Sequence, residues 1–82
     1  MEINLNVEEK KLLLEKVNLS LRLRNFVLLL GENSKLEISE SDSAEFWEFC
    51  TEALSVIGFT GENDKPTEDG LILERLIDKF YA

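Results

Sequence analysis

Polar and apolar residues recur along the first third of the chain with the period of an α-helix. Asn6 and Glu9 have the spacing of a capping box, so a helix is predicted to begin after Asn6. Polar residues then follow at steps of three and four, opposite a stripe of leucines that ends at Leu30. Gly31 is a natural residue to follow a helix C-terminus. We therefore expect one long helix over about residues 7–30.

A different period competes within this segment. Residues 17–24 alternate strictly between apolar and polar, which is typical of a half-buried β-strand. A turn through residues 31–34 would then lead into a second strand near residues 36–38, giving an α+β fold with a hairpin over about residues 17–38. The helix is favoured because its polar stripe crosses residues 17–24 without a break. The alternation keeps the strand hypothesis open.

Two further helices have clear start signals. Ser39 has capping-box spacing to Asp42, and the helix that follows extends to about Ile57, with Gly58 as its predicted end. A polar loop over residues 60–66 separates it from a third helix, which Thr67 can cap. The inner faces of these two helices are expected to contain Phe46, Cys50, Ala53, Ile57, Ile72, Leu73, Leu76, Ile77 and Phe80.

A short apolar–polar alternation precedes each of the first two helices, at residues 3–5 and 36–38. Either local capping preferences explain this recurrence, or the two segments pair as a short ribbon. Eighty-two residues make one small domain, over residues 1–82. The predicted fold class is all-α, a small three-helix bundle, to which the ribbon would add a very short two-stranded β contact.

The charge is unevenly distributed along the chain. The net charge is −8, yet residues 1–35 carry six basic and five acidic side chains, a sum of +1. Residues 36–82 carry three basic and twelve acidic side chains, a sum of −9. Direct nucleic-acid binding is therefore not expected, because it needs clustered basic residues. Arg22 and Arg24 are expected to pair with the acidic second helix.

The composition excludes several kinds of chemistry. Without histidine and with a single cysteine, the chain cannot form a Cys/His zinc site, a disulfide framework or a histidine-based catalytic site. Cys50 lies on an apolar row, where a thiol is inert. The acidic loop over residues 61–69 lacks the ligand spacing of an EF-hand. We expect no catalytic, metal or cofactor site, and a divalent-cation-dependent regulator is the third-ranked hypothesis.

The location of the protein can also be addressed from these features. The longest apolar run, residues 26–30, is far shorter than the roughly 20 residues that span a bilayer. The chain shows no signal-peptide pattern, and its odd thiol suits a reducing compartment. We therefore expect a cytoplasmic protein without a membrane-bound state.

Surplus apolar residues on the first two helices suggest a binding surface. They lie off the main core rows, and a domain of this size cannot bury them all. We predict a non-catalytic protein-interaction module that self-associates, as a homodimer or other homo-oligomer, through an apolar strip with an acidic rim. The alternative is that a third helix covers the strip. Its residues are Leu14, Leu21, Leu28, Trp47, Phe49 and Val56.

The second helix supports an alternative function. Glu45, Glu48 and Glu52 form an acidic face without a basic residue on the same helix. Such a face could imitate a phosphate backbone and neutralise a basic partner, as an immunity-like inhibitor or antidote protein does. It could equally serve only to keep the protein in solution. The sequence leaves this choice open.

Overall fold

The predicted start signals act as helix caps. At the start of α1 (Val7–Glu15), the Glu9 amide donates to Asn6 Oδ1 at 2.8 Å and the Asn6 amide donates to Glu9 Oε1 at 2.9 Å. Ser39 Oγ accepts from the Asp42 amide at 3.1 Å where α3 (Glu40–Ile57) begins. These bonds satisfy amides that have no partner inside a helix. The capping box and the Ser39 cap are thus confirmed.

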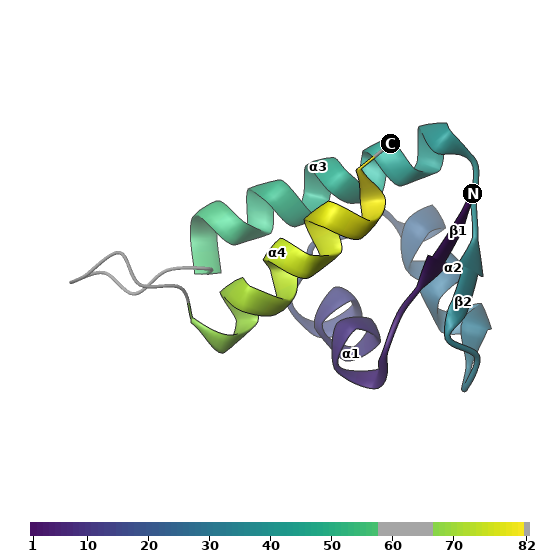
Figure 1. Ribbon diagram of the computed structural model, residues 1–82, viewed down its shortest axis with the longest axis horizontal. Helices are drawn as coiled ribbons and strands as arrows, with labels where there is room; N and C mark the ends of the chain where they lie inside the picture. Colours follow the sequence, from purple (N-terminus) through teal and green to yellow (C-terminus); the bar gives the residue numbers. More distant parts are fainter. Residues whose placement is uncertain (58–66, 82) are drawn as a thin grey trace.

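The computed structural model describes residues 1–57 and 67–81. Within them the element order is β1 (Glu2–Asn4), α1, α2 (Leu21–Leu30), β2 (Lys35–Glu37), α3 and α4 (Glu68–Phe80), shown in Figure 1. Thr67 caps α4, since its side chain accepts from the Gly70 amide at 2.9 Å. The all-α class with a short β contact is confirmed. The predicted helix end at Gly58 and the loop over residues 60–66 lie outside the described residues.

The prediction of one continuous helix over residues 7–30 is wrong. Residues 16–20 separate α1 from α2, so the described residues contain four helices instead of three. Ser20 caps α2 by accepting from the Leu23 amide, and Val17 is buried between the helices. A straight helix of this length, about 36 Å, could lay only one side on a single core. The break lets both halves bury leucines against the same core.

The strand hypothesis for residues 17–24 is also wrong. Residues 21–24 belong to α2, and Val17 to Leu19 form an irregular turn in which the Leu19 amide donates to the Val17 carbonyl at 2.9 Å. The partner of β2 is therefore β1 and not this segment. The alternating residues therefore belong to an irregular turn, a helix cap and the first turn of α2. Over so few residues, an apolar–polar alternation does not require a strand.

The short ribbon predicted between residues 3–5 and 36–38 is confirmed. β1 and β2 are antiparallel, with Ile3 opposite Leu36. The pairing continues at both ends, because the Leu5 amide donates to the Ser34 carbonyl at 2.7 Å and the Ile38 amide donates to the Met1 carbonyl at 3.0 Å. The side chains of Ile3, Leu5, Leu36 and Ile38 are buried, so the ribbon adds an apolar face to the helical core.

The centre of the core lies between α3 and α4, which run side by side in Figure 1. The rings of Phe46 and Phe80 stack with centroids 4.6 Å apart and planes 7° from parallel. Ser43 Oγ, also buried, donates to the Phe80 carbonyl at 2.7 Å and satisfies a helix-end acceptor. The fully buried Leu73 and Leu76 complete this contact.

Candidate functional site

The structure separates the six residues of the predicted interface strip. Leu14 and Leu28 line a hollow of about 580 Å³ between α1 and α2. Phe49 and Val56 line a different hollow, of about 130 Å³, beside the end of α1. Leu21 is exposed at the far end of α2, and Trp47 packs on the core with its indole nitrogen buried and unbonded. The strip is therefore two small surfaces instead of one continuous contact face.

α2 has far more apolar surface than it buries. Seven of its ten residues are apolar, but only Leu23 and Val27 are buried. Three leucines are exposed: Leu21 by 74%, Leu28 by 53% and Leu29 by 84%. Exposed leucines one at a time are ordinary on a protein surface, but three on one short helix make part of α2 a candidate contact surface.

Part of α2 combines with α1 into one apolar surface. Val7 lines the same hollow as Leu14 and Leu28, and Leu29, which follows Leu28 in α2, is exposed. We call Val7, Leu14, Leu28 and Leu29 the α1–α2 face. Val7 and Leu29 are missing from the predicted strip. Their exposure could not be predicted, because a single long helix gives no indication that residues 7 and 28 meet.

A lysine holds the α1–α2 face together. Lys10 Nζ donates to the Gly31 carbonyl at 3.0 Å and to the Asn33 carbonyl at 2.9 Å. These acceptors lie just beyond the C-terminus of α2, where a positive charge interacts favourably with the helix dipole. Gly31 adopts a positive φ of 55°, which a residue with a side chain rarely does. The start of α1 is thereby hydrogen-bonded to the end of α2 at the edge of the hollow.

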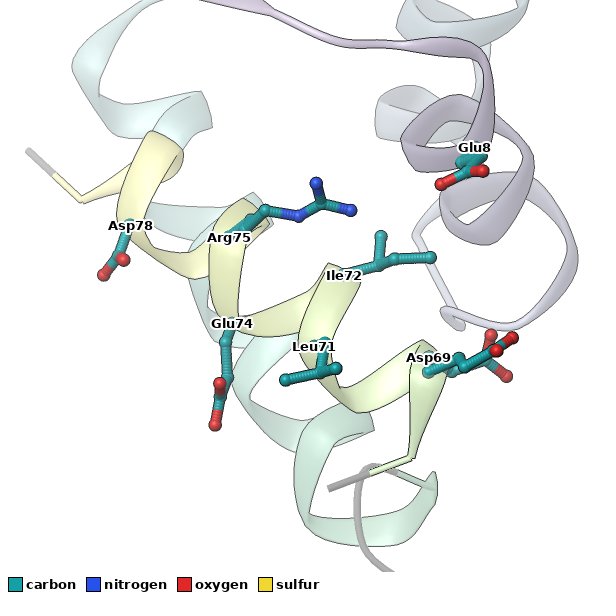
Figure 2. Close-up of a pocket in the computed structure, with 8 residues that line it drawn as sticks. Glu8, Asp69, Leu71, Ile72, Glu74, Arg75 and Asp78 are labelled. Atoms are coloured by element: carbon teal, nitrogen blue, oxygen red, sulfur yellow. The ribbon is translucent and has the colours of Figure 1, made fainter. Parts of the chain in front are cut away.

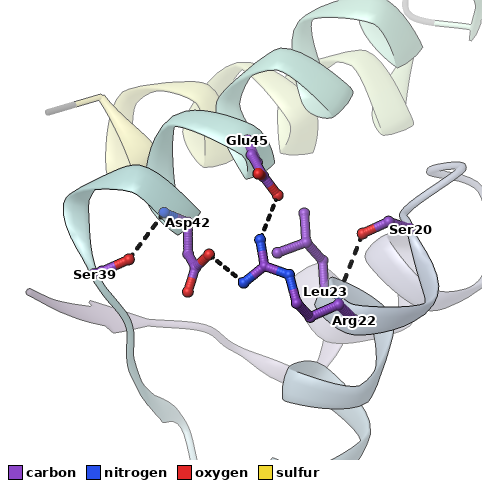
Figure 3. A network of polar contacts seen from close by, with 6 residues as sticks. All are labelled: Ser20, Arg22, Leu23, Ser39, Asp42 and Glu45. Atoms are coloured by element: carbon purple, nitrogen blue, oxygen red, sulfur yellow. Dashed lines mark hydrogen bonds and ion pairs between the residues drawn. The ribbon is translucent and has the colours of Figure 1, made fainter.

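One member of the predicted acidic face is already paired within the chain. Arg22 of α2 bonds Asp42 at 2.5 Å and Glu45 at 2.8 Å, as Figure 3 shows. The hydrogen bond that Arg22 donates to Asp42 raises the pKa of Arg22 above its usual value, and the charges of both carboxylates act in the same direction. This confirms the pairing expected for Arg22, whereas Arg24 makes no ion pair among residues 1–57 and 67–81. Glu48 and Glu52 remain exposed on α3.

A second acidic surface lies where α1 meets α4. A hollow of about 680 Å³ is lined by five carboxylates and one arginine, and Arg75 extends from α4 toward α1 in Figure 2. Asp69, at one edge, bonds Lys16 at 2.5 Å, and this hydrogen bond raises the pKa of Lys16. The sequence did not indicate this surface, because it joins Glu8 of α1 to four carboxylates of α4 that lie 60 to 70 positions further along the chain. The carboxylates are those of Glu8, Glu68, Asp69, Glu74 and Asp78.

These acidic groups do not form a metal centre. No group of three or more potential ligands is close enough to hold a metal ion within the part of the chain that the structure describes. The loop over residues 61–69 that was weighed as a cation site lies mostly outside that part. The described carboxylates therefore provide negative charge and hydrogen-bond acceptors on the surface.

Two titratable side chains among the described residues are buried, those of Cys50 and Glu9, and the contacts of both are explained by the fold. Burial raises the pKa of the Cys50 thiol to about 12, so the thiolate that would act as a nucleophile does not form at neutral pH. Glu9, with no exposed surface, accepts through Oε1 from Lys79 Nζ at 2.7 Å as well as from the Asn6 amide. Lys79 also donates to the Asn4 carbonyl at 2.8 Å, so these groups link α4 to α1 and β1.

Comparison with protein-family models, curated proteins and solved structures found no match to this chain. The function must therefore be argued from the geometry. No described helix has the length and the apolar character needed to cross a membrane.

Proposed function

We propose that this protein is a non-catalytic protein-interaction module whose contact surface is the α1–α2 face. The observation that carries the proposal is the exposure of Leu28 and Leu29 beside a hollow lined by Val7 and Leu14. Among the described residues, the buried Cys50 thiol stays protonated at neutral pH and the buried Glu9 is paired with Lys79. We also propose a cytoplasmic location, because a lone buried thiol suits a reducing compartment.

The energetics support a binding role for this face. A fully buried leucine side chain contributes about 1.5–3 kcal/mol relative to an exposed one, and α2 gains none of this for Leu29 within its own fold. The same surface lies outside the strongly acidic half of the chain, since both α1 and α2 precede residue 36. Apolar side chains in a nearly neutral setting are typical of the core of a protein interface, from which charged residues are depleted.

The size of the protein in an extract of its own cells tests the proposal. Detected with an antibody on a native sizing column, the wild-type chain should run well above its own 9.4 kDa. The double variant Leu28→Ser/Leu29→Ser should run as a monomer, because its contact surface has lost its apolar side chains. Leu21→Ser is the matched control, since Leu21 is equally exposed on α2 but outside the α1–α2 face.

Two results would overturn the proposal. One is a wild-type chain that runs as a monomer in the extract. The other is a complex that survives Leu28→Ser/Leu29→Ser as well as it survives Leu21→Ser. The melting temperatures of both purified variants should match the wild type, because all three leucines are exposed. This comparison separates a lost contact from a lost fold.

The acidic hollow between α1 and α4 favours a second candidate function, that of an inhibitor or antidote for a basic protein. The hollow is lined by five carboxylates and one arginine, and this excess of negative charge would attract a basic surface. A basic nuclease is a suitable probe. Under this hypothesis its affinity falls steeply between about 50 mM and 500 mM salt, because ions screen exposed charges. An affinity that is independent of salt, or unchanged by Glu74→Gln, would contradict it.

A further inference from the structure

We propose that the molecule covering the α1–α2 face is a second copy of this chain, which presents the same face across a twofold axis. This inference rests on the proposed function and names its partner. The twofold arrangement is the commonest one for homo-oligomers, and it requires a surface that is complementary to itself. Three properties of the α1–α2 face meet that requirement.

The first property is charge. Two identical chains of net charge −8 repel each other unless they meet where the charge is low. Residues 1–35, which include α1 and α2, sum to +1, whereas residues 36–82 sum to −9. A strongly basic partner would be drawn to the second group instead. The α1–α2 face, whose hollow is lined by one basic and one acidic side chain, is therefore a surface through which a second copy can approach with little repulsion.

The second property is shape. The face combines a hollow, lined by Val7, Leu14 and Leu28, with the exposed side chain of Leu29, the residue after Leu28 in α2. A twofold axis would place Leu29 of each copy against the hollow of the other. The contact would join two helix pairs into one four-helix layer, an arrangement in which apolar faces of helix pairs are commonly buried.

The third property is the rim of the hollow. Lys10 and Glu32 both line it, so its edge carries one positive and one negative side chain. An edge with both signs tolerates a copy of itself, whereas an edge of one sign would place like charges together. Lys10 also keeps its bonds to the end of α2, so it can neutralise the edge without moving.

Light scattering on the purified full chain provides the first test. The mass should rise from 9.4 kDa toward twice that value as the concentration approaches about 500 µM. Leu28→Ser should raise the dissociation constant about 30-fold, because each substitution acts once in each copy. Val7→Ser should also weaken the dimer. Val56→Ser, on α3 with the same 75% exposure, should leave it unchanged.

A mixing experiment tests the symmetry. Leu28→Lys and Leu28→Glu should each be monomeric alone, because the twofold axis brings like charges near one another. Their equimolar mixture should dimerise, because opposite charges then meet. Misfolding cannot produce this recovery, so the mixture distinguishes a lost contact from a damaged chain.

The outcomes separate this inference from the proposed function. A purified wild-type chain that stays monomeric, while the extract holds a complex sensitive to Leu28→Ser/Leu29→Ser, overturns the second copy and leaves the interaction module standing. A wild-type dimer with a mixture that stays monomeric overturns the twofold use of this face. The twofold use of this face is also overturned if Val56→Ser weakens the dimer as much as Val7→Ser.

Discussion

The two helix pairs of this protein use their apolar residues differently. α3 and α4 expose only Val56 and Leu71 among their large apolar side chains over their described lengths, and they stack Phe46 on Phe80. α2 is much shorter and yet exposes three leucines. α3 and α4 therefore form the centre of the core, whereas α2 contributes to the core and also has apolar surface that the fold does not bury.

The largest effect should come from the same substitution made in both pairs. Leu73 on α4 has no exposed surface, whereas Leu29 on α2 is 84% exposed. We expect Leu73→Ala to lower the free energy of unfolding by about 2–5 kcal/mol, because it leaves a cavity in the core. Leu29→Ala should change it by no more than about 0.5 kcal/mol. Urea unfolding measures both, and similar losses would remove the distinction between the two pairs.

The second prediction concerns the buried contact that joins the pairs. Lys79→Met leaves the Glu9 carboxylate buried with only the Asn6 amide as its partner. Breaking a buried ion pair costs about 3–5 kcal/mol, and we expect about 2–3 kcal/mol because the Lys79 side chain is 36% exposed. Lys35→Met is the control, since the Lys35–Glu2 pair is exposed and 3.8 Å long.

A double variant identifies the cause of this loss. Adding Glu9→Gln to Lys79→Met removes the uncompensated charge, so part of the lost stability should return. If the double variant is no more stable than Lys79→Met, the buried carboxylate is not what Lys79 stabilises. The measurement is again the free energy of unfolding in urea.

The third prediction uses pH to compare a buried with an exposed cysteine. The folded chain holds the Cys50 proton with a pKa of about 12, whereas the unfolded thiol ionises with a pKa of about 8.5. Ionisation therefore favours the unfolded state above this lower value, and stability is lost as the pH rises. We expect a fall of about 2 kcal/mol between about pH 8 and pH 10.

Two control variants compare a thiol in the core with a thiol on the exposed surface of α2. Cys50→Ala should flatten the fall, because no thiol remains in the core. Leu29→Cys/Cys50→Ala places the thiol on the exposed surface of α2, where folding does not shift its ionisation, and should behave like Cys50→Ala. A double variant that restores the fall would show that burial is not its cause.

The smallest effect is expected at the exposed ion pairs between α2 and α3. Arg22→Gln removes the bonds to Asp42 and Glu45, and Arg24→Gln removes the same charge from the same helix without removing a described ion pair. Arg22→Gln should lower the melting temperature slightly more, by about a degree. This difference should disappear in about 1 M salt, and a difference that persists would show that the pairs act through packing instead of charge.

Local signals predicted much of the fold correctly. Asn6, Ser39 and Thr67 cap the helices that their spacing indicated, because each bonds an amide only three residues away. The ribbon of Ile3 with Leu36 followed from the alternation before two helices. The break before Ser20 was missed, although serine is a favoured cap. The polar stripe crosses the break in phase, so periodicity alone could not show that the chain turns there.

The candidate site was predicted only in part, and partly for the wrong reason. Leu14 and Leu28 were grouped because residues seven apart share one side of a long helix. They do lie together, but because α2 folds back on α1. That same fold places Val7 and Leu29 beside them, and it leaves Trp47 packed on the core. Which apolar residues stay uncovered depends on the packing of the whole chain, and no window of sequence contains that information.

Local signals indicated where α1, α3 and α4 begin, offered the pairing of two short segments as one of two interpretations, and located the acidity after residue 35. These properties depend on neighbouring residues or on simple counts. Only the tertiary structure decided that Arg22 pairs with Asp42, that Lys79 reaches Glu9, and that α2 keeps its leucines exposed. The physical reason is that capping satisfies groups a few bonds apart, whereas burial and ion pairing depend on segments that only the folded chain brings together.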